Sequence, residues 1–305
     1  MAESVFEIRR LKKEDLVKYH AFSDAEVWNV GIDVYEKMFE ISPNGFFCAE
    51  NSETHEIVSF CGAVDIGDNR AIVVSFITKP ELRGRGIGTR VIKKVLEQFE
   101  NYEIIVNSAV GREKMYERLG MKKFLYQTNQ LICRPKMSKN NEKRKFSRTD
   151  LLLEIDDVFE FDQKICKSER QNILKWFFKT SEKGYVAKNE KEEINGYALV
   201  RKTPLGISLS PFYAQTETSL REILENVLFD FPTCDVQICL PIENKFTLKI
   251  LEEYFHIKIS SCCVSKDAPE NLALSLPNTW LGSKEDFEFE KSSVVSILDF
   301  HYAVC

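Results

Sequence analysis

Apolar runs of strand length alternate along the chain with stretches in which apolar residues recur at helical spacing. In the first half, the short runs are bounded by Gly, Asn, Asp or Pro, which predicts strands. The predicted strands are Phe6–Arg10, Phe46–Glu50, Ile57–Val64, Ala71–Thr78 and Glu103–Val106. Asn44-Gly45 predicts a turn before the second strand, and Gly67-Asp68-Asn69 predicts a hairpin turn between the third and the fourth.

Helices are predicted around these strands. One helical region lies between Lys12 and Phe39, and a second follows Gly88. The apolar face of the second helix is formed by Val91, Ile92, Val95, Leu96 and Phe99. A short third helix over Arg112–Leu119 ends at Gly120, a residue type that commonly closes helices. Strands followed by a strand–turn–helix–strand–helix order predict an α/β (α+β) fold with a mixed sheet.

A polar, cationic stretch, Pro135–Lys145, interrupts these patterns and indicates a solvated linker. The predicted organisation is an N-terminal domain over 1–135, a linker over 136–147 and a C-terminal domain over 148–305. A length of 305 residues agrees with two domains of roughly 150 residues each.

The second half of the chain is predicted to be a degenerate repeat of the first. Aligning Pro80 with Pro211 superposes two strand–turn–helix units, and a strand and a helix follow in both. The helix of the second unit has its own apolar face, formed by Leu220, Ile223, Leu224, Val227 and Leu228. In this register Glu217 replaces Gly86, which places a carboxylate at the start of the helix. We therefore predict that the second copy keeps the scaffold and lacks the chemistry.

Composition narrows the class of protein. With 44% hydrophobic and 29% charged residues, the chain is globular rather than disordered. A net charge of -5 offers no bulk attraction to nucleic acid or to an anionic membrane. No apolar stretch approaches the roughly 18 residues that span a bilayer, and the N-terminus lacks a signal-peptide pattern. We expect a soluble, cytoplasmic protein with no nucleic-acid or membrane partner.

Cysteine and histidine usage predicts no metal site. The four histidines are widely separated, and the nine cysteines show neither zinc-site spacing nor a disulfide framework. Packing in the core is the expected role of the cysteines, although a nucleophilic cysteine that meets a histidine only in the fold stays open.

A glycine-rich turn carries the strongest chemical signal. Glycines at 84, 86 and 88, flanked by Arg83 and Arg85, lie between a strand and a helix. Bare amides at a helix N-terminus together with two guanidinium groups suit a pyrophosphate. The alternative is a tight turn without a ligand. The turn lacks the Lys-Ser or Lys-Thr of a Walker A loop and the G-x-G-x-x-G spacing of a dinucleotide site.

Three segments in this order resemble the GCN5-related N-acetyltransferase (GNAT) superfamily. Arg83-Gly-Arg-Gly-Ile-Gly88 matches its Q/R-x-x-G-x-G/A loop, Phe76-Ile-Thr78 matches its bulged strand, and Met115-Tyr-Glu-Arg-Leu-Gly-Met121 matches its Tyr-containing helix. The chain also resembles a tandem subfamily whose second GNAT-like half is degenerate. Two tandem domains of the GNAT fold are therefore implied.

The resemblance implies acetyl-CoA as co-substrate. Its binding residues would be Phe76, Ile77, Thr78, Arg83, Gly84, Arg85, Gly86, Ile87, Gly88 and Thr89. Tyr116 matches the Tyr that protonates the leaving thiolate in this family, and its alternative is a buried core aromatic. No general base can be identified; Ser75, Glu50 and Asp65 lie on or beside strands expected to flank the site.

The resemblance also suggests an acceptor pocket lined by Trp28, Asp162, Arg170 and Arg201. Trp28 could equally be a core residue, and the three charged residues could instead form ion pairs within their own domain. The resulting hypothesis is an acyl-CoA-dependent N-acyltransferase that moves an acetyl group to an amine of a small molecule. The alternative is an inactive CoA-binding or protein-interaction module. The sequence does not determine the oligomeric state.

Overall fold

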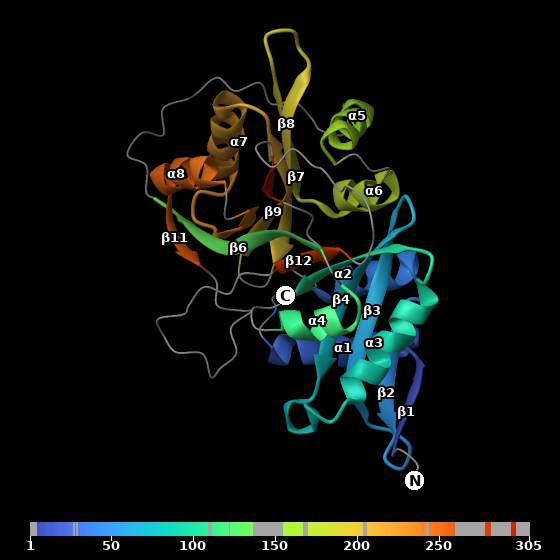
Figure 1. The fold of residues 1–305 in the computed structure, drawn as a ribbon. Coiled ribbons are helices and arrows are strands. Elements are labelled where there is room, and N and C mark those ends of the chain that lie inside the picture. Colours follow the sequence, from blue (N-terminus) through green and yellow to red (C-terminus); the bar gives the residue numbers. More distant parts are fainter. Residues whose placement is uncertain are drawn as a thin grey trace. The chain divides into compact units, whose positions relative to one another are not determined.

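The chain forms two compact units, seen in a computed structural model. The structure describes residues 5–26, 28, 30–108, 112–121, 123–136, 155–166, 170–203, 206–241, 244–259, 278–281 and 294–296. Unit 1 comprises Met1–Leu125, Pro277–Lys284 and Phe300–Cys305, and unit 2 comprises Tyr126–Leu276 and Glu285–Asp299. Each unit is built around its own mixed sheet (Figure 1).

The sheet of unit 1 has the strand order β1-β2-β3-β4-β5-β12. These strands are β1 (Phe6–Arg10), β2 (Phe46–Asn51), β3 (Ile57–Gly67), β4 (Arg70–Thr78), β5 (Glu103–Ser108) and β12 (Asn278–Leu281). Only β4 and β5 pair in parallel. A parallel pair needs a crossover connection, and here the glycine-rich turn and a helix supply it.

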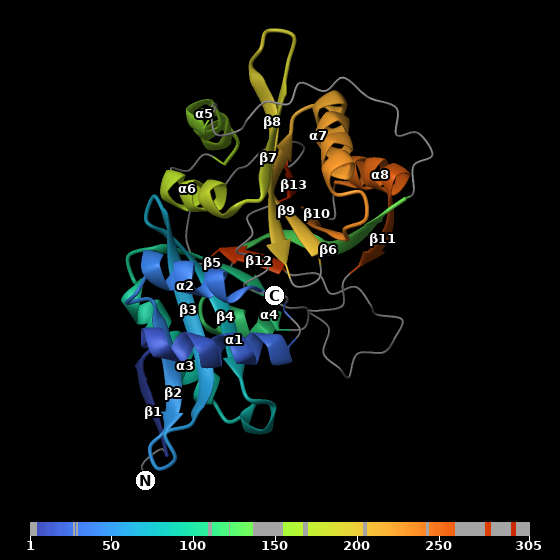
Figure 2. The ribbon, with the colours of Figure 1, turned by 180° about the vertical axis from the view of Figure 1, so that it is seen from behind.

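Helices cover both faces of this sheet, as Figures 1 and 2 show together. They are α1 (Leu16–Ala25) and α2 (Ile32–Ile41) on one face, and α3 (Ile87–Gln98) on the other, with the short α4 (Glu113–Arg118) between β5 and β6. Beneath α3, buried Val91, Ile92 and Val95 join one apolar core with residues of β2–β5. The predicted apolar face of this helix is confirmed.

Unit 2 repeats the arrangement with the strand order β7-β8-β9-β10-β6-β11. The strands are β7 (Lys183–Lys188), β8 (Ile194–Thr203), β9 (Gly206–Ala214), β10 (Val236–Pro241), β6 (Lys123–Pro135) and β11 (Phe255–Ile259). Its helices are α5 (Ile155–Cys166), α6 (Gln171–Thr180), α7 (Glu217–Asp230) and α8 (Lys245–Tyr254). A short strand, β13 (Val294–Ser296), also pairs with β9.

The two units exchange strands, so their division differs from the predicted domain boundaries. Strand β6, whose residues fall within the predicted domain over 1–135, lies in unit 2 from Tyr126 onward and pairs there with β10 and β11. In return, β12 from the last thirty residues of the chain pairs with β5 in unit 1. The predicted linker over 136–147 lies outside the described residues from 137 onward. Among the described helices, none is both long and apolar enough to span a membrane.

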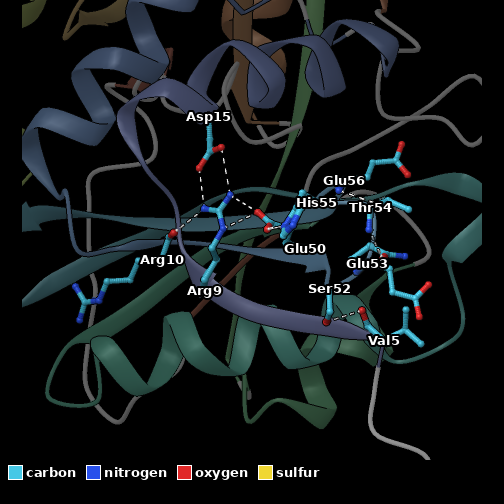
Figure 3. A network of polar contacts seen from close by, with 11 residues as sticks. Val5, Arg9, Arg10, Asp15, Glu50, Ser52, Glu53, Thr54, His55 and Glu56 are labelled. Atoms are coloured by element: carbon cyan, nitrogen blue, oxygen red, sulfur yellow. Dashed lines mark hydrogen bonds and ion pairs between the residues drawn. The ribbon is translucent and has the colours of Figure 1, made fainter.

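A polar network fixes the start of unit 1 (Figure 3). Arg9 of β1 donates hydrogen bonds to Asp15 Oδ2 at 2.8 Å and to Glu50 Oε2 at 2.7 Å. Asp15, only 4% exposed, also accepts the Lys12 amide, and Glu50 contacts His55 Nδ1 at 3.1 Å. The network therefore ties β1 and β2 to the short turn from which α1 begins.

These contacts lower two carboxyl pKa values. Burial alone would raise the pKa of Asp15, but the hydrogen bonds from Arg9 and from the Lys12 amide outweigh burial and bring it below its usual value. The pKa of Glu50 is lowered by the hydrogen bond with His55 and then by that with Arg9. A carboxyl group whose pKa is lower in the folded than in the unfolded protein stabilises the fold at any pH above its unfolded-state pKa. This stabilisation is lost as the pH falls through the folded-state pKa.

We therefore expect the free energy of unfolding, measured by urea denaturation, to fall as the pH is lowered from 7 to 3. Asp15→Asn should remove about 3 kcal/mol at pH 7, because Arg9 loses a buried partner, and should flatten the pH dependence. The exposed neighbour Glu14 provides the matched control Glu14→Gln, which should behave as wild type. An Asp15→Asn variant with an unchanged pH slope would contradict the assignment.

Candidate active site

Strand β4 carries a bulge in its second half. Its register with β3 moves from Phe60↔Ile77 to Gly62↔Val74, so Ser75 and Phe76 together face a single residue. Ser75 has a φ of 49°, a left-handed conformation that a non-glycine residue adopts at some cost. This confirms that Phe76–Thr78 lies on a bulged strand.

Beyond the bulge, β4 has lost its parallel neighbour. Pairing between β4 and β5 runs from Arg70↔Glu103 to Val73↔Val106 and then ends. We call the region beyond Val73, where these two strands no longer pair, the unit 1 split. Beyond Val73, β4 still pairs with β3 at Val74, Ile77 and Thr78 but, within the described part of the chain, no longer with β5, so a ligand that hydrogen-bonds like a strand could lie along that edge.

Two buried tyrosines support the bulge from the α1–α2 face. The Tyr19 hydroxyl lies 3.5 Å from the carbonyl oxygen of Val74 and 3.4 Å from that of Ser75. The Ser75 hydroxyl lies 3.5 Å from that of Tyr35. Burial raises the pKa of Tyr19 and raises that of Tyr35 to about 12, so both hydroxyls keep their protons. Sequence reasoning missed both residues, because each reads as an ordinary core aromatic on a helix.

The glycine-rich turn leaves backbone amides exposed at the start of α3. Gly84 and Gly86 both have a φ of 77°, and a Cβ at either position would meet no atom within 4 Å. Gly86 is the N-cap of α3, which has neither a side-chain cap nor an acidic residue in its first turn. The first amides of this helix therefore have no partner of the usual capping kind, and the helix dipole favours an anion there.

Gly88 serves a different purpose, which is close packing of α3 on β4. A Cβ at this position would lie 2.7 Å from Thr78 Oγ1 and 2.8 Å from the Phe76 ring. Only glycine lets the helix approach at this distance. The structure thereby brings the predicted Phe76–Thr78 segment and the predicted loop together. Ile87 contributes only its backbone to the loop, because its side chain is buried in the core.

The two loop arginines differ in their surroundings. Arg83 donates to the Thr78 carbonyl at 2.9 Å and forms an ion pair of 2.5 Å with Glu26, just after α1. Arg85 is exposed, as is Thr89. Glu26 lies two residues before the half-buried Trp28, so the ion pair brings the segment after α1 to the loop. No sequence signal marked Glu26, which is 57 residues from Arg83 along the chain.

Tyr116 of α4 is buried, with 6% of its surface exposed. Its side chain belongs to the same apolar cluster as Ile87 and Cys61. Burial, assisted by Cys61 and opposed by Arg112, raises its pKa well above the ordinary value of 10. The phenol therefore holds its proton and could donate it to a strong base such as a thiolate. The structure is also compatible with the alternative role in packing.

Two of the three residues considered as a general base are engaged elsewhere. Glu50 belongs to the Arg9 network, and Asp65 accepts hydrogen bonds from Tyr102 Oη at 3.1 Å and from the Gly67 amide at 2.8 Å. Ser75 lies in the bulge itself. Among the described residues, no group of three or more His, Cys, Asp or Glu is placed to hold a metal ion.

In unit 2, Asp162 and Arg170 form a buried ion pair. An ion pair within the domain was the predicted alternative to a role in the acceptor pocket. Arg170 Nε and Nη2 lie 2.7 and 2.5 Å from the two Asp162 oxygens. Tyr197 donates to Asp162 at 2.5 Å, and Arg170 donates to the Tyr213 hydroxyl at 2.8 Å. Arg201 lies separately, with its guanidinium 5.3 and 5.1 Å from the ring centres of Trp176 and Phe177 on α6.

The internal repeat is real, but the predicted register is wrong. Pro211 lies inside β9, at a bulge that matches the one in β4, whereas Pro80 follows β4. The N-cap equivalent to Gly86 is Thr216, not the predicted Glu217. In unit 1, eight residues (79–86) connect β4 to α3, whereas in unit 2 only Gln215 and Thr216 connect β9 to α7. A helix can follow its strand this closely where the connection does not have to surround a ligand.

The start of α7 is closed by its own side chains. The Thr216 hydroxyl accepts from the Ser219 amide at 3.1 Å, and the Ser219 hydroxyl lies 3.1 Å from the Thr216 amide, a capping box. Glu217 lies in the first turn, as a carboxylate was predicted to, and pairs with Arg221 at 2.8 Å. Unit 2 therefore has the bulged strand and the helix but lacks an anion cradle at this point.

Both halves match models of one family. Residues 6–121 match the acetyltransferase (GNAT) family, and residues 158–269 match an acetyltransferase (GNAT) domain. A protein named holothin acyltransferase, from Pseudoalteromonas sp. (strain SANK 73390), is 24% identical over 245 residues, which are 76% of this chain and 79% of that protein.

Solved structures share the whole fold. A putative acetyltransferase from Pyrococcus horikoshii superposes with a TM-score of 0.72 at 19% identity, covering 100% of this chain and 98% of its own. A GCN5-related N-acetyltransferase from Sphaerobacter thermophilus gives a TM-score of 0.61 at 10% identity, covering 92% and 96%. At such identities these likenesses show the fold alone.

The bulged strand, the glycine-rich turn and the parallel crossover define unit 1 as an acyltransferase domain of the GNAT class. The chain belongs to the GNAT acetyltransferase family and carries two GNAT domains in tandem.

The Glu26–Arg83 ion pair gives a test of the loop's charge. Because both side chains are partly exposed, Glu26→Gln should change the unfolding temperature little. Affinity for inorganic pyrophosphate, measured by calorimetry, should rise severalfold, since Arg83 is no longer neutralised. The matched control is Glu40→Gln, which breaks the exposed pair with Lys37 on α2 and should leave affinity unchanged. Equal affinities in all three proteins would show that Arg83 does not face the anion.

Proposed function

We propose that this protein is an acyl-CoA-dependent N-acyltransferase that transfers an acetyl group from acetyl-CoA to an amine of a small molecule. The observation that carries the proposal is the juxtaposition of two sets of backbone groups in unit 1. The uncapped start of α3 packs at Gly88 against the side chains of Thr78 and Phe76, two residues of β4 that lie beyond its last pair with β5. Together they offer an anion site and a strand-like hydrogen-bonding edge.

This arrangement fits the parts of acetyl-CoA. The amides and arginines of Arg83–Thr89 would hold the pyrophosphate, because a helix N-terminus with glycines in left-handed conformations presents several N–H groups to one anion. The edge of Phe76–Thr78 would hold the extended amide chain of the pantetheine arm. When bound, acetyl-CoA supplies the acyl thioester that an amine attacks.

Tyr116 is the proposed acid. Its raised pKa keeps the proton on the phenol oxygen at neutral pH, so it can transfer this proton to sulfur as the carbon–sulfur bond breaks. The carbon–nitrogen bond to the acceptor forms in the same exchange. The amine gives up one proton to solvent, and the phenolate takes one proton back from solvent, which restores Tyr116. We assign no side chain as the base.

Evidence for the acceptor comes from a relative. The name of the holothin acyltransferase states that it acylates holothin, and it aligns with three quarters of this chain. From this name we extend only the reaction class, acyl transfer; a small molecule bearing an amine is the acceptor that we propose. Trp28, two residues after Glu26, is the proposed wall of the acceptor pocket in unit 1. Asp162, Arg170 and Arg201 are retained as proposed pocket residues of unit 2.

The second candidate is a CoA-binding module without turnover. The observation that favours it is the burial of Tyr116 within the apolar core, where a tyrosine needs no catalytic role. Release of free thiol from acetyl-CoA in the presence of a panel of amines distinguishes the two. Turnover with any amine supports the enzyme, and tight acetyl-CoA binding with none supports the module.

Gly88→Asp should weaken acetyl-CoA binding at least tenfold, about 1.4 kcal/mol. The side chain would collide with Thr78 and Phe76 and would place a carboxylate at the start of α3. Calorimetry measures the affinity, and circular dichroism confirms the fold. Gly88→Asn adds the same bulk without the charge and should lose less affinity. Wild-type affinity in the Gly88→Asp protein would refute the pyrophosphate assignment.

Tyr116→Phe should lower kcat at least tenfold while acetyl-CoA affinity stays within about twofold of wild type, since only the proton donor is lost. Because the pKa of Tyr116 is raised, the ratio of wild-type to variant kcat should stay constant up to pH 10. Tyr185→Phe, in unit 2, removes a hydroxyl bound to Asp230 and serves as control. Unchanged kcat in Tyr116→Phe would remove this residue from the mechanism.

A further inference from the structure

Unit 2 contains a counterpart of the unit 1 split. Strands β9 and β10 pair in parallel at Ile207↔Val236 and Ser208↔Gln237 only. Both strands continue, β9 to Ala214 and β10 to Pro241, without pairing with one another. We call the region beyond Ser208 and Gln237, where these strands no longer pair, the unit 2 split.

The far edges of both strands are already used. Along its other edge β9 pairs with β8, including Phe212↔Ala198 and Tyr213↔Tyr197. Along its other edge β10 pairs with β6 over its whole length. A strand has only two edges, so any further strand on Phe212 and Tyr213 must lie on the side of β9 that faces β10.

Strand β13 occupies that position. It pairs antiparallel with β9 at Val294↔Tyr213 and Ser296↔Phe212, and it also contacts β10. Figure 2 shows β13 beside β9 and β10. The segment Val294–Ser296 therefore lies in the unit 2 split. It comes from a part of the chain more than fifty residues after the end of β10, beyond the strands and helices of the internal repeat.

The neighbouring helix shows why a nucleotide does not take this place. The capping box already engages the Thr216 and Ser219 amides at the start of α7, where a pyrophosphate would need free N–H groups, and Glu217 adds a negative charge. The split itself, however, keeps the geometry that binds an extended chain of amides. A peptide strand offers such amides without any phosphate, so it can use this edge where acyl-CoA cannot.

We propose that the unit 2 split is a binding site for an extended peptide, filled in cis by residues 294–296, and that this segment is its resident ligand. Unit 2 thus binds a strand by β-augmentation at the edge corresponding to the one at which unit 1 is proposed to bind acetyl-CoA. The proposal follows from strand pairing alone, so it stands whether or not unit 1 binds acetyl-CoA.

Hydrogen exchange in the full-length chain tests the occupancy. In Val294→Pro/Ser296→Pro both substituted residues lose the N–H that a strand donates, so peptides covering Phe212–Ala214 should exchange at least tenfold faster than in wild type. Exchange in β7 and in β1–β2 should not change, which reports that the units stay folded. Val294→Ala/Ser296→Ala keeps both amides and should match wild type. If the double proline variant unfolds, Ser296→Pro alone replaces it.

A synthetic peptide of residues 291–299 tests the binding site in trans. Added at roughly millimolar concentration, which matches the effective concentration of a tethered segment, it should restore slow exchange at Phe212–Ala214 of the proline variant. The same peptide with proline at positions 294 and 296 should not. Equal exchange in wild type and proline variant would overturn the occupancy, and failure of the peptide to restore protection would overturn the binding site. Neither readout involves acetyl-CoA, so either failure leaves the proposed function untouched.

Discussion

The function that we propose for unit 1 depends on the place where β4 stops pairing with β5. Pairing of β4 with β5 stops at Val73, and a bulge at Ser75 and Phe76 interrupts the register of β4 with β3 before Ile77 and Thr78 pair again. Buried backbone groups without partners are costly, so such an edge persists only where side chains, water or a ligand satisfy it. Tyr19 meets two of the carbonyls, and the glycine-rich turn adds amides at the start of α3.

The two units show how a few residues decide whether one scaffold has the uncapped helix start that we propose as a nucleotide site. Both have a bulged strand whose parallel neighbour pairs only at its beginning. Unit 1 connects that strand to its helix through a glycine-containing turn and leaves the helix uncapped. In unit 2 the connection between the bulged strand and its helix has two residues, and a capping box of Thr216 and Ser219 closes the start of the helix. A side-chain cap stabilises a helix by about 1 kcal/mol, and α3 lacks this contribution at the place where we propose that the pyrophosphate binds.

Strand exchange makes the two units depend on each other along the chain. Strand β6 leaves the first half of the sequence to pair within unit 2, and β12 returns from the end of the chain to pair within unit 1. Neither sheet can therefore be completed from its own half of the sequence. This argues against functional tests on an isolated N-terminal half, since the edge of β5 would be left without its partner.

Local patterning determined the strands β1 to β5, the apolar face of α3, the glycine-rich turn and its likeness to an acyltransferase loop, because each follows from periodicity or from residues adjacent in sequence. Only the tertiary structure decided the partners that lie far apart: Glu26 against Arg83, Tyr19 against the bulge, β6 and β12 in each other's units, and β13 in the unit 2 split. It also changed the equivalent of Gly86 from the predicted Glu217 to Thr216, since insertions in a turn leave the hydrophobic pattern of strand and helix unchanged. A sequence records which side chains can be buried and where the chain can turn; which distant edge or charge meets them depends on packing that no local pattern encodes.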